Sequence, residues 1–262
     1  MILSPSEDSN LQKSKFDKKP HKSLLAHVIC ADACLESAYV EVLQGKKADL
    51  LLTDPPYCLL TRRRKHGDLR DPKGRKIDRA PVVRFDTVRD YTKFTKTWLP
   101  LAVKYIKTTS PLVIWTNFLG RAVIIKVASE LGYNHLWGEF IWAKRTTKNT
   151  GSEQLLRVYE TALVLGCQPS VSLSPTDHAQ AWAVVAGYDD DGEATLYGNH
   201  PHHKPFSVLE PLLRNYSQPG DLILDPFAGS GSIAASACRL NRYAATIELE
   251  NEWVDKVKLR LR

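Results

Sequence analysis

The sequence contains little cysteine and no long apolar run: only five of its 262 residues are cysteine, and no two of them form a Cys-x-x-Cys pair. An odd number of cysteines without that spacing predicts free thiols in a reducing compartment, and no structural zinc site. No uninterrupted apolar stretch approaches the ~20 residues that a membrane-spanning helix requires. Residues 1–22 are polar and lack the hydrophobic segment of a secretory signal. We therefore expect a cytoplasmic protein with neither a membrane partner nor a bound metal.

Positive charge is unevenly distributed along the chain. There are 36 Lys and Arg residues against 29 Asp and Glu, which gives a net charge of +7. Residues 61–84 alone contain ten basic and three acidic residues, so this one segment holds a surplus equal to that of the whole chain. Such a concentration is typical of a surface that binds a polyanion, although a solvated loop with no partner has the same composition.

Short apolar stretches alternate with segments of helical periodicity, which predicts a doubly wound α/β fold with a mostly parallel sheet covered on both faces. The expected strands are 25–30, 49–53, 112–115, 139–143, 159–165, 221–224 and 243–247. The expected helices are 91–106, 121–131, 205–216, 232–240 and a last one striped by Trp253, Val257 and Leu261. We expect residues 1–23 to form a flexible tail, residues 24–262 a single domain, and the polar stretch 168–199 an irregular insertion.

A glycine-containing turn, Asp-Pro-Phe-Ala-Gly-Ser-Gly-Ser at residues 225–232, connects an expected strand to an expected helix. Gly229 and Gly231 would let the backbone approach a ligand closely, and the helix that follows offers free N–H groups. Glu248 ends the next expected strand, where an acidic residue typically holds ribose hydroxyls. The turn lacks the lysine that a P-loop requires. Ala234 stands at the third glycine position of the dinucleotide-binding fingerprint, where alanine is tolerated, so a dinucleotide cofactor is not excluded. The combination predicts a site for a nucleoside-containing cofactor; a tight structural turn is the alternative.

The tetrapeptide Asp54-Pro55-Pro56-Tyr57 follows another expected strand and so faces the same edge of the sheet. Two prolines stiffen the turn, and the Asp54 carboxylate and the Pro55 carbonyl can together accept both N–H groups of one amine. Tyr57 offers a flat ring on which a base can stack, worth about 1–3 kcal/mol. The tetrapeptide predicts a clamp for the exocyclic amine of a planar heterocycle; a proline-stiffened turn with a capping Asp is the alternative.

Together these segments resemble the motifs of the S-adenosylmethionine-dependent amino-methyltransferases of DNA. Asp54–Tyr57 resembles motif IV, residues 225–231 resemble motif I, and His-Pro-His-His-Lys-Pro at 200–205 resembles motif X. Residues 31–36 are similar to the segment that precedes motif IV in the family, and the strand that contains Glu160 resembles the one after motif VII. The catalytic motif precedes the cofactor motif, as it does in the β class.

The resemblance covers about residues 25–262 and implies a Rossmann-like methyltransferase fold with a permuted motif order, S-adenosylmethionine as cofactor and double-stranded DNA as substrate. It implies catalytic roles for Asp54, Pro55, Pro56 and Tyr57. The residues that it assigns to the cofactor are Asp32, Ala33, Lys204, Pro205, Asp225, Phe227, Gly229, Ser230, Gly231 and Glu248. Within that set, Asp225 would lie near the methionine amino group, Lys204 near the methionine carboxylate and Glu248 at the ribose.

The basic segment follows Tyr57 directly, so we expect a DNA-facing loop over residues 60–90 that begins at the mouth of the site. The side chains expected to contact DNA are Arg62, Arg63, Arg64, Lys65, Arg75 and Lys76. Residues 166–200 form a candidate target-recognition insertion, because β-class proteins resemble one another in carrying such a region here; an ordinary surface insertion is the alternative. The sequence leaves two further interactions undecided: formation of a homodimer, and association with a cognate restriction enzyme. DNA binding would associate the protein with the nucleoid.

The resemblance favours methylation of adenine N6, because Asp54 stands where the cytosine-N4 members of the family more often carry Ser. Cytosine-N4 methylation, with the same fold and cofactor, is the nearest alternative. Two others come from different classes: an RNA or protein amino-methyltransferase, and a non-catalytic DNA-binding relative.

Overall fold

The computed structural model describes residues 25–60, 83–145, 159–169, 184–188 and 203–262. The predicted tail 1–23, most of the basic loop 60–90 and most of the insertion 166–200 lie outside the described residues. The same holds for the predicted DNA-contacting side chains Arg62, Arg63, Arg64, Lys65, Arg75 and Lys76. No helix in the described ranges has both the length and the apolar character needed to cross a bilayer.

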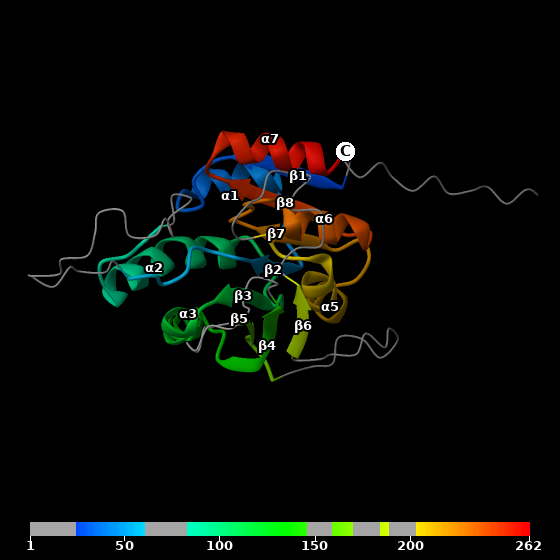
Figure 1. The fold of residues 1–262 in the computed structure, drawn as a ribbon. Coiled ribbons are helices and arrows are strands. Elements are labelled where there is room, and N and C mark those ends of the chain that lie inside the picture. The colour runs from blue at the N-terminus through cyan, green and yellow to red at the C-terminus, as the bar shows by residue number, and fades with distance from the viewer. Residues whose placement is uncertain (1–24, 61–82, 146–158, 170–183, 189–202) are drawn as a thin grey trace, which may run out of the picture.

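A central eight-stranded sheet has the strand order β1-β8-β7-β2-β3-β5-β4-β6 (Figure 1). The strands are β1 Ala26–Cys30, β2 Leu50–Thr53, β3 Leu112–Thr116, β4 His135–Arg145, β5 Tyr159–Gly166, β6 Val184–Tyr188, β7 Leu222–Asp225 and β8 Tyr243–Glu248. Among these strands only β5 runs antiparallel to its neighbours, and every other pairing is parallel. The predicted doubly wound, mostly parallel sheet is confirmed.

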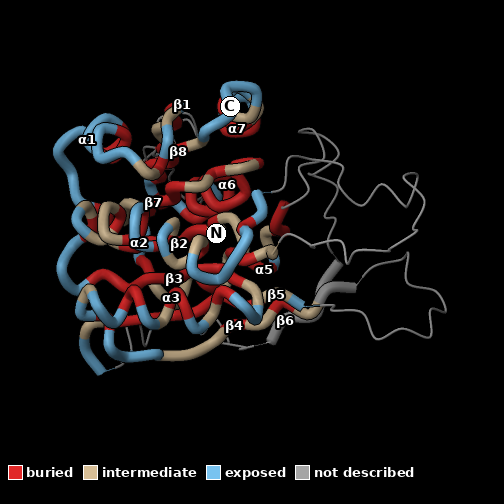
Figure 2. The backbone as a smooth tube through the Cα atoms, turned by 90° about the vertical axis from the view of Figure 1, so that its left-hand side faces the viewer, coloured by how far each residue is buried: buried red, intermediate tan, exposed pale blue. Residues whose placement is uncertain are grey.

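Helices cover both faces of this sheet (Figure 1). They are α1 Glu36–Leu43, α2 Val88–Lys104, α3 Phe118–Glu130, α5 Phe206–Tyr216, α6 Ser232–Arg239 and α7 Asn251–Arg260. One hydrophobic core lies between the sheet and α1, α2 and α3, and a second lies between the sheet and α5, α6 and α7. Figure 2 shows that the buried backbone is concentrated in the strands and in the helix faces turned toward them.

The central strands are apolar on both sides because each side packs under a helical layer. In β2, Leu51 belongs to the first core, while Leu50 and Leu52 belong to the second. All three are fully buried, and each contributes about 1.5–3 kcal/mol of apolar burial. The continuous leucine run therefore specifies a strand in the middle of a two-sided sheet.

Two elements were not expected from the sequence. Helix α1 buries Ala38, Tyr39 and Val42, although its short, weakly amphipathic sequence gave no helical signal. The stretch 168–199 was predicted to be irregular, and this is wrong for Val184–Tyr188, which forms β6 and pairs in parallel with β4. Pairing with the outer edge of β4 satisfies backbone groups there, and that benefit is not visible in a local sequence window.

The parallel direction of the strands creates one functional edge. Strands β1, β8, β7 and β2 run parallel to one another, so the chain segments that follow them all leave the sheet at the same edge. In sheets of this kind the crevice at the carboxyl ends is where ligands bind. The predicted cofactor turn and the predicted amine clamp therefore meet at this edge.

Candidate active site and cofactor pocket

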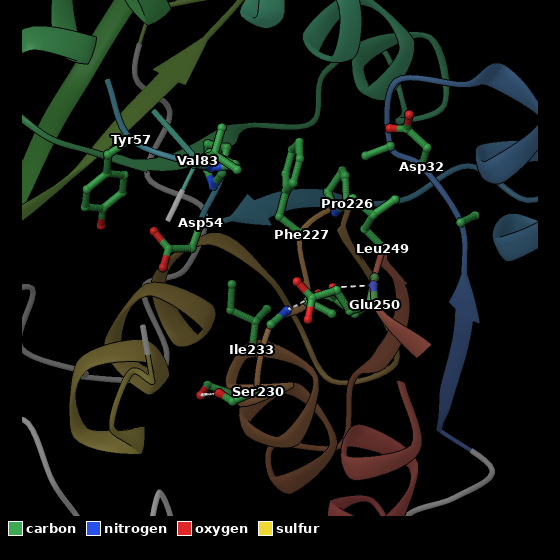
Figure 3. Close-up of a pocket in the computed structure, with 18 of the residues that line it drawn as sticks. Asp32, Asp54, Tyr57, Val83, Pro226, Phe227, Ser230, Ile233, Leu249 and Glu250 are labelled. Atoms are coloured by element: carbon green, nitrogen blue, oxygen red, sulfur yellow. Dashed lines mark hydrogen bonds between the residues drawn. The ribbon is translucent and has the colours of Figure 1, made fainter. Parts of the chain in front are cut away.

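A cavity of about 280 Å³ opens at this edge of the sheet. The predicted residues that line it are Asp32, Ala33, Asp54, Pro55, Pro56, Tyr57, Lys204, Phe227, Gly229, Ser230 and Glu248. Figure 3 shows Asp54 and Tyr57 at one end of the cavity, Asp32 and Glu250 at the other, and Phe227 between them. Pro205, Asp225 and Gly231 do not line it. The two predicted half-sites thus form one continuous space.

The middle of the cavity has a rigid apolar wall. The Phe227 ring packs edge-on against the buried Trp98 ring, with centroids 5.2 Å apart, and tilts against Phe94 at 6.0 Å. Phe94 lines the cavity as well, and it lies in the helix expected at residues 91–106. Aromatic packing of this kind holds a flat, apolar surface that suits a planar heterocycle.

Glu248 stands at the far end of the cavity with both carboxylate oxygens anchored by the backbone. Oε2 accepts a hydrogen bond from the Gly229 N–H at 2.8 Å, and Oε1 accepts one from the Glu250 N–H at 2.9 Å. Burial raises the pKa of Glu248, while these backbone bonds act against the shift. Each carboxylate oxygen can accept a second bond, so the group remains able to bind a pair of hydroxyls. At the end of β1, Asp32 accepts from the Cys34 N–H at 2.8 Å.

Gly231 has a packing role in the glycine turn. Its φ of +73° lies in the left-handed region, and a Cβ added there would lie 2.7 Å from Val257 Cγ1 of helix α7. Gly229 also has a positive φ, +50°, and it lines the cavity. The two glycines therefore serve different purposes: Gly229 brings backbone to the cavity, and Gly231 lets α6 and α7 pack closely.

We expect Gly231→Ala to lower the free energy of unfolding by about 2–4 kcal/mol, because it combines backbone strain with overpacking against Val257. Denaturant titration measures this loss. Gly132→Ala is the matched control, since Gly132 also has a positive φ but nothing lies within 4 Å of its added Cβ. Equal losses in the two variants would contradict the packing role.

Asp225 lies beneath the cavity and joins β7 to β2. Its Oδ1 accepts from Thr53 Oγ1 at 2.8 Å and from the Phe227 N–H at 3.1 Å. Its Oδ2 is buried and has no hydrogen-bond partner among the described residues. Desolvation raises the pKa of Asp225 from 3.8 to about 7, although the bonds from Thr53 and Phe227 favour the charged form. The buried carboxyl group therefore keeps its proton to a much higher pH than a solvent-exposed Asp does.

The raised pKa of Asp225 predicts a loss of stability with rising pH. Between about pH 4 and pH 7 the unfolded chain releases this proton while the folded chain keeps it, so the free energy of unfolding falls. Asp225→Asn cannot ionise and retains Oδ1 as an acceptor. We expect its stability relative to the unmodified protein to improve by about 2–3 kcal/mol from pH 5 to pH 8. Urea titrations at the two pH values measure this, and parallel stability curves would refute it.

The tetrapeptide Asp54–Tyr57 is held by side chains from distant parts of the chain. Lys204 Nζ donates to Asp54 Oδ2 and lies 3.0 Å from Glu160 Oε2 in β5. The Tyr57 hydroxyl donates to the same Glu160 oxygen at 2.9 Å, and Asn117 Nδ2 donates to the Cys58 carbonyl at 2.9 Å. The loop that leaves β2 is thus fixed from both sides.

Asp54 Oδ1 is buried, and no group among the described residues bonds to it. Burial, reinforced by the charges of Asp54 and Glu160, raises the pKa of Tyr57 well above its usual range, so the phenol stays neutral. Glu160 was noted in the sequence only as part of a resembling strand. A signal that could have pointed to it is that Glu160 is the one charged residue in the mostly apolar strand β5.

Behind the glycine turn, a buried network ties motif X to the C-terminal helix. His203 Nδ1 lies 3.0 Å from Ser232 Oγ, and Arg260 Nη1 donates to the Ser230 carbonyl at 3.1 Å and to Ser232 Oγ at 3.2 Å. Helix α7 therefore holds the turn in place from the side away from the cavity. Among the described residues there is no cluster of three His, Cys, Asp or Glu side chains that could hold a metal ion.

Comparison with known proteins identifies the family. A family model described as DNA methylase, of the N6/N4 methyltransferase type, matches residues 48–259. The Type II methyltransferase M.HinfI of Haemophilus influenzae is 25% identical over 249 residues, which is 87% of this chain and 66% of that protein. The Type II methyltransferase M2.DpnII of Streptococcus pneumoniae is 22% identical over 236 residues, or 85% of each chain.

Solved structures show the same fold. The crystal structure of an M1.HpyAVI–SAM complex has a TM-score of 0.65 at 21% identity, covering 90% of this chain and 99% of that one. The cytosine-N4-specific PvuII DNA methyltransferase has a TM-score of 0.64 at 16% identity, covering 90% and 86%. The chain therefore belongs to the N6/N4 DNA methylase family, whose cofactor is S-adenosylmethionine. The resemblance seen in the sequence motifs is confirmed.

Proposed function

We propose that this protein is a site-specific DNA methyltransferase that transfers a methyl group from S-adenosylmethionine to the N6 amino group of an adenine flipped out of double-stranded DNA. The observation that carries the proposal is the Asp54 side chain, a residue that lines the cavity and whose buried Oδ1 has no partner among the described residues. Such an atom suits the N–H donor of an incoming amine, because a buried acceptor without a partner is costly.

The other end of the cavity fits the cofactor. We propose that the Glu248 carboxylate, anchored by the backbone, accepts bonds from the ribose hydroxyls, and that the Phe227 wall contacts the adenine ring. Asp32, exposed at the end of β1, lies at this same end (Figure 3). The bound cofactor supplies a sulfonium-activated methyl group. The chain's own task is to hold the target amine in line with it.

The amine end would activate a poor nucleophile. The nitrogen lone pair of an exocyclic adenine amine is delocalised into the ring, and two acceptors drawing on its N–H groups localise that pair. Asp54 Oδ1 and the Pro55 carbonyl would be these acceptors, while Tyr57 stacks on the base. As the new N–C bond forms and the C–S bond breaks, the nitrogen gains positive charge. Its surplus proton passes to Asp54 Oδ1 and from there to water.

DNA would reach this end through the basic loop 60–90, whose arginines and lysines are proposed to contact phosphates. Flipping the base costs a few kcal/mol, which phosphate binding and stacking on Tyr57 offset. Adenine is proposed over cytosine because an Asp rather than a Ser begins the tetrapeptide. Cytosine-N4 methylation is the second candidate, favoured by the structural likeness to the cytosine-N4-specific PvuII enzyme.

The experiment is methyl transfer from labelled S-adenosylmethionine to unmethylated genomic DNA, followed by digestion to nucleosides and mass analysis. We expect the label in N6-methyladenine. Label in N4-methylcytosine would overturn the choice of base and keep the chemistry. No label in DNA, with the cofactor bound, would overturn the proposed function and direct the same assay to RNA and protein substrates, or to a non-catalytic DNA-binding role.

A further inference from the structure

Lys204 lies between two carboxylates at the amine end of the cavity. Its ammonium group donates to Asp54 Oδ2, lies 3.0 Å from Glu160 Oε2 and sits 4.7 Å from the centroid of the Trp115 ring. The Lys204 side chain is 3% exposed, so water does not replace these contacts. Burial disfavours the charged form, but Asp54 and Glu160 outweigh it and raise the pKa of Lys204. The group is therefore a cation at neutral pH.

This contact holds the Asp54 carboxylate in one orientation. The terminal torsion of an Asp side chain is broad and roughly two-fold, so a free carboxylate rotates easily. Here Lys204 occupies Oδ2, and Oδ1 is left buried without a partner among the described residues. The Asp54 side chain is only 13% exposed, so its orientation depends on Lys204 rather than on solvent.

Glu160 extends the same arrangement to Tyr57. One atom, Glu160 Oε2, accepts from the Tyr57 hydroxyl at 2.9 Å and pairs with Lys204 Nζ at 3.0 Å. The stacking ring and the cation that orients Asp54 are thus positioned by the same oxygen. With two carboxylates and one ammonium, the three charged groups Asp54, Glu160 and Lys204 carry a net charge of about −1. A negative cluster of this kind stabilises positive charge that develops on an adjacent nitrogen.

We propose that Lys204 and Glu160 are positioning residues for the methyl transfer, an inference that rests on the proposed function. Lys204 turns Asp54 Oδ1 toward the target amine, and Glu160 holds both Lys204 and the Tyr57 ring. This differs from the role that the sequence resemblance implies for Lys204, which is to lie near the methionine carboxylate of the cofactor. The two roles predict different kinetics.

The test compares Lys204→Met with the unmodified protein by single-turnover methylation of DNA at saturating cofactor, and by calorimetric titration of S-adenosylmethionine. We expect the transfer rate to fall about 100-fold, with the cofactor Kd within threefold of the unmodified value. A Kd raised tenfold or more with a near-normal rate at saturation would overturn the proposal, because Lys204 would then serve the cofactor. Lys258→Met, at an exposed position in α7, is the control for loss of a lysine.

Lys204→Met leaves two partly buried carboxylates without their cation, so its fold is checked by thermal melting. Glu160→Gln is the second variant, because it preserves size and one acceptor while removing one negative charge. We expect a transfer rate at least tenfold lower, an unchanged cofactor Kd, and an altered pH–rate profile. A normal rate and profile in Glu160→Gln would overturn the role of Glu160.

Chemical rescue tests whether the positive charge of Lys204 orients Asp54 or whether the Lys204 side chain only fills space. In Lys204→Ala, added methylammonium is expected to raise the transfer rate at least tenfold, whereas methanol at the same concentration leaves it unchanged. Equal rescue by both, or by neither in a folded variant, would overturn the proposed role of the charge. A lack of DNA methylation by the unmodified protein in the same assay would refute the proposed function instead, which keeps the two failures distinct.

Discussion

Replacing Asp54 with Ala is expected to lower the rate of methyl transfer to DNA by at least about 10²–10³-fold, while the cofactor Kd stays within threefold. The variant removes the proposed amine acceptor, which belongs to a residue that lines the cavity, and leaves the Glu248 end, where the cofactor is proposed to bind, unchanged. Single-turnover methylation at saturating cofactor measures the rate, and calorimetric titration measures the Kd.

Asp255→Ala is the matched control for Asp54→Ala, because it removes an exposed carboxylate from α7. We expect its rate to equal that of the unmodified protein. Near-normal turnover in Asp54→Ala would exclude Asp54 as the amine acceptor. A large loss of cofactor binding in that variant would show instead that the two ends of the cavity are not independent.

Replacing Glu248 with Gln is expected to weaken S-adenosylmethionine binding about 30- to 150-fold. Two charge-assisted bonds to ribose hydroxyls contribute about 2–3 kcal/mol together, and the amide of Gln replaces one acceptor with a donor. The same amide faces the backbone N–H of either Gly229 or Glu250, which loosens the turn. Calorimetric titration in the absence of DNA measures the effect directly.

The control for Glu248→Gln is Glu252→Gln, which makes the same change at an exposed position in α7. We expect its cofactor Kd to match that of the unmodified protein. Because the amine end is untouched in Glu248→Gln, the transfer rate at saturating cofactor should fall far less than in Asp54→Ala. A cofactor Kd unchanged in Glu248→Gln would remove Glu248 from the ribose site.

Local patterns were sufficient for the elements whose residues carry their own signal. The leucine run of β2 and the apolar β3 predicted buried parallel strands, and both lie in the middle of the sheet. The glycine turn after β7 and the tetrapeptide after β2 were expected at one edge, and they line one cavity. Since all parallel strands end on the same side, strand order was not needed for that conclusion.

Other features depend on partners far away in the chain. Strand β6 exists because β4 offers it an edge, and its own five residues gave no alternating pattern. Gly231 was interpreted as a ligand-binding glycine, yet the steric demand at that position comes from Val257 in a different helix. Glu160 acquires its importance only because the sheet order places β5 beside β3.

The sequence by itself determined the fold class, the family and the two motifs that meet at the carboxyl edge, because spacing within a few residues encodes each of them. The tertiary structure alone decided how the charged groups pair. Lys204 and Asp54 are 150 positions apart, and their contact arises from the packing of two chain segments against the same strand edge. Such a buried pairing depends on burial and orientation in three dimensions, which no local pattern of residues contains.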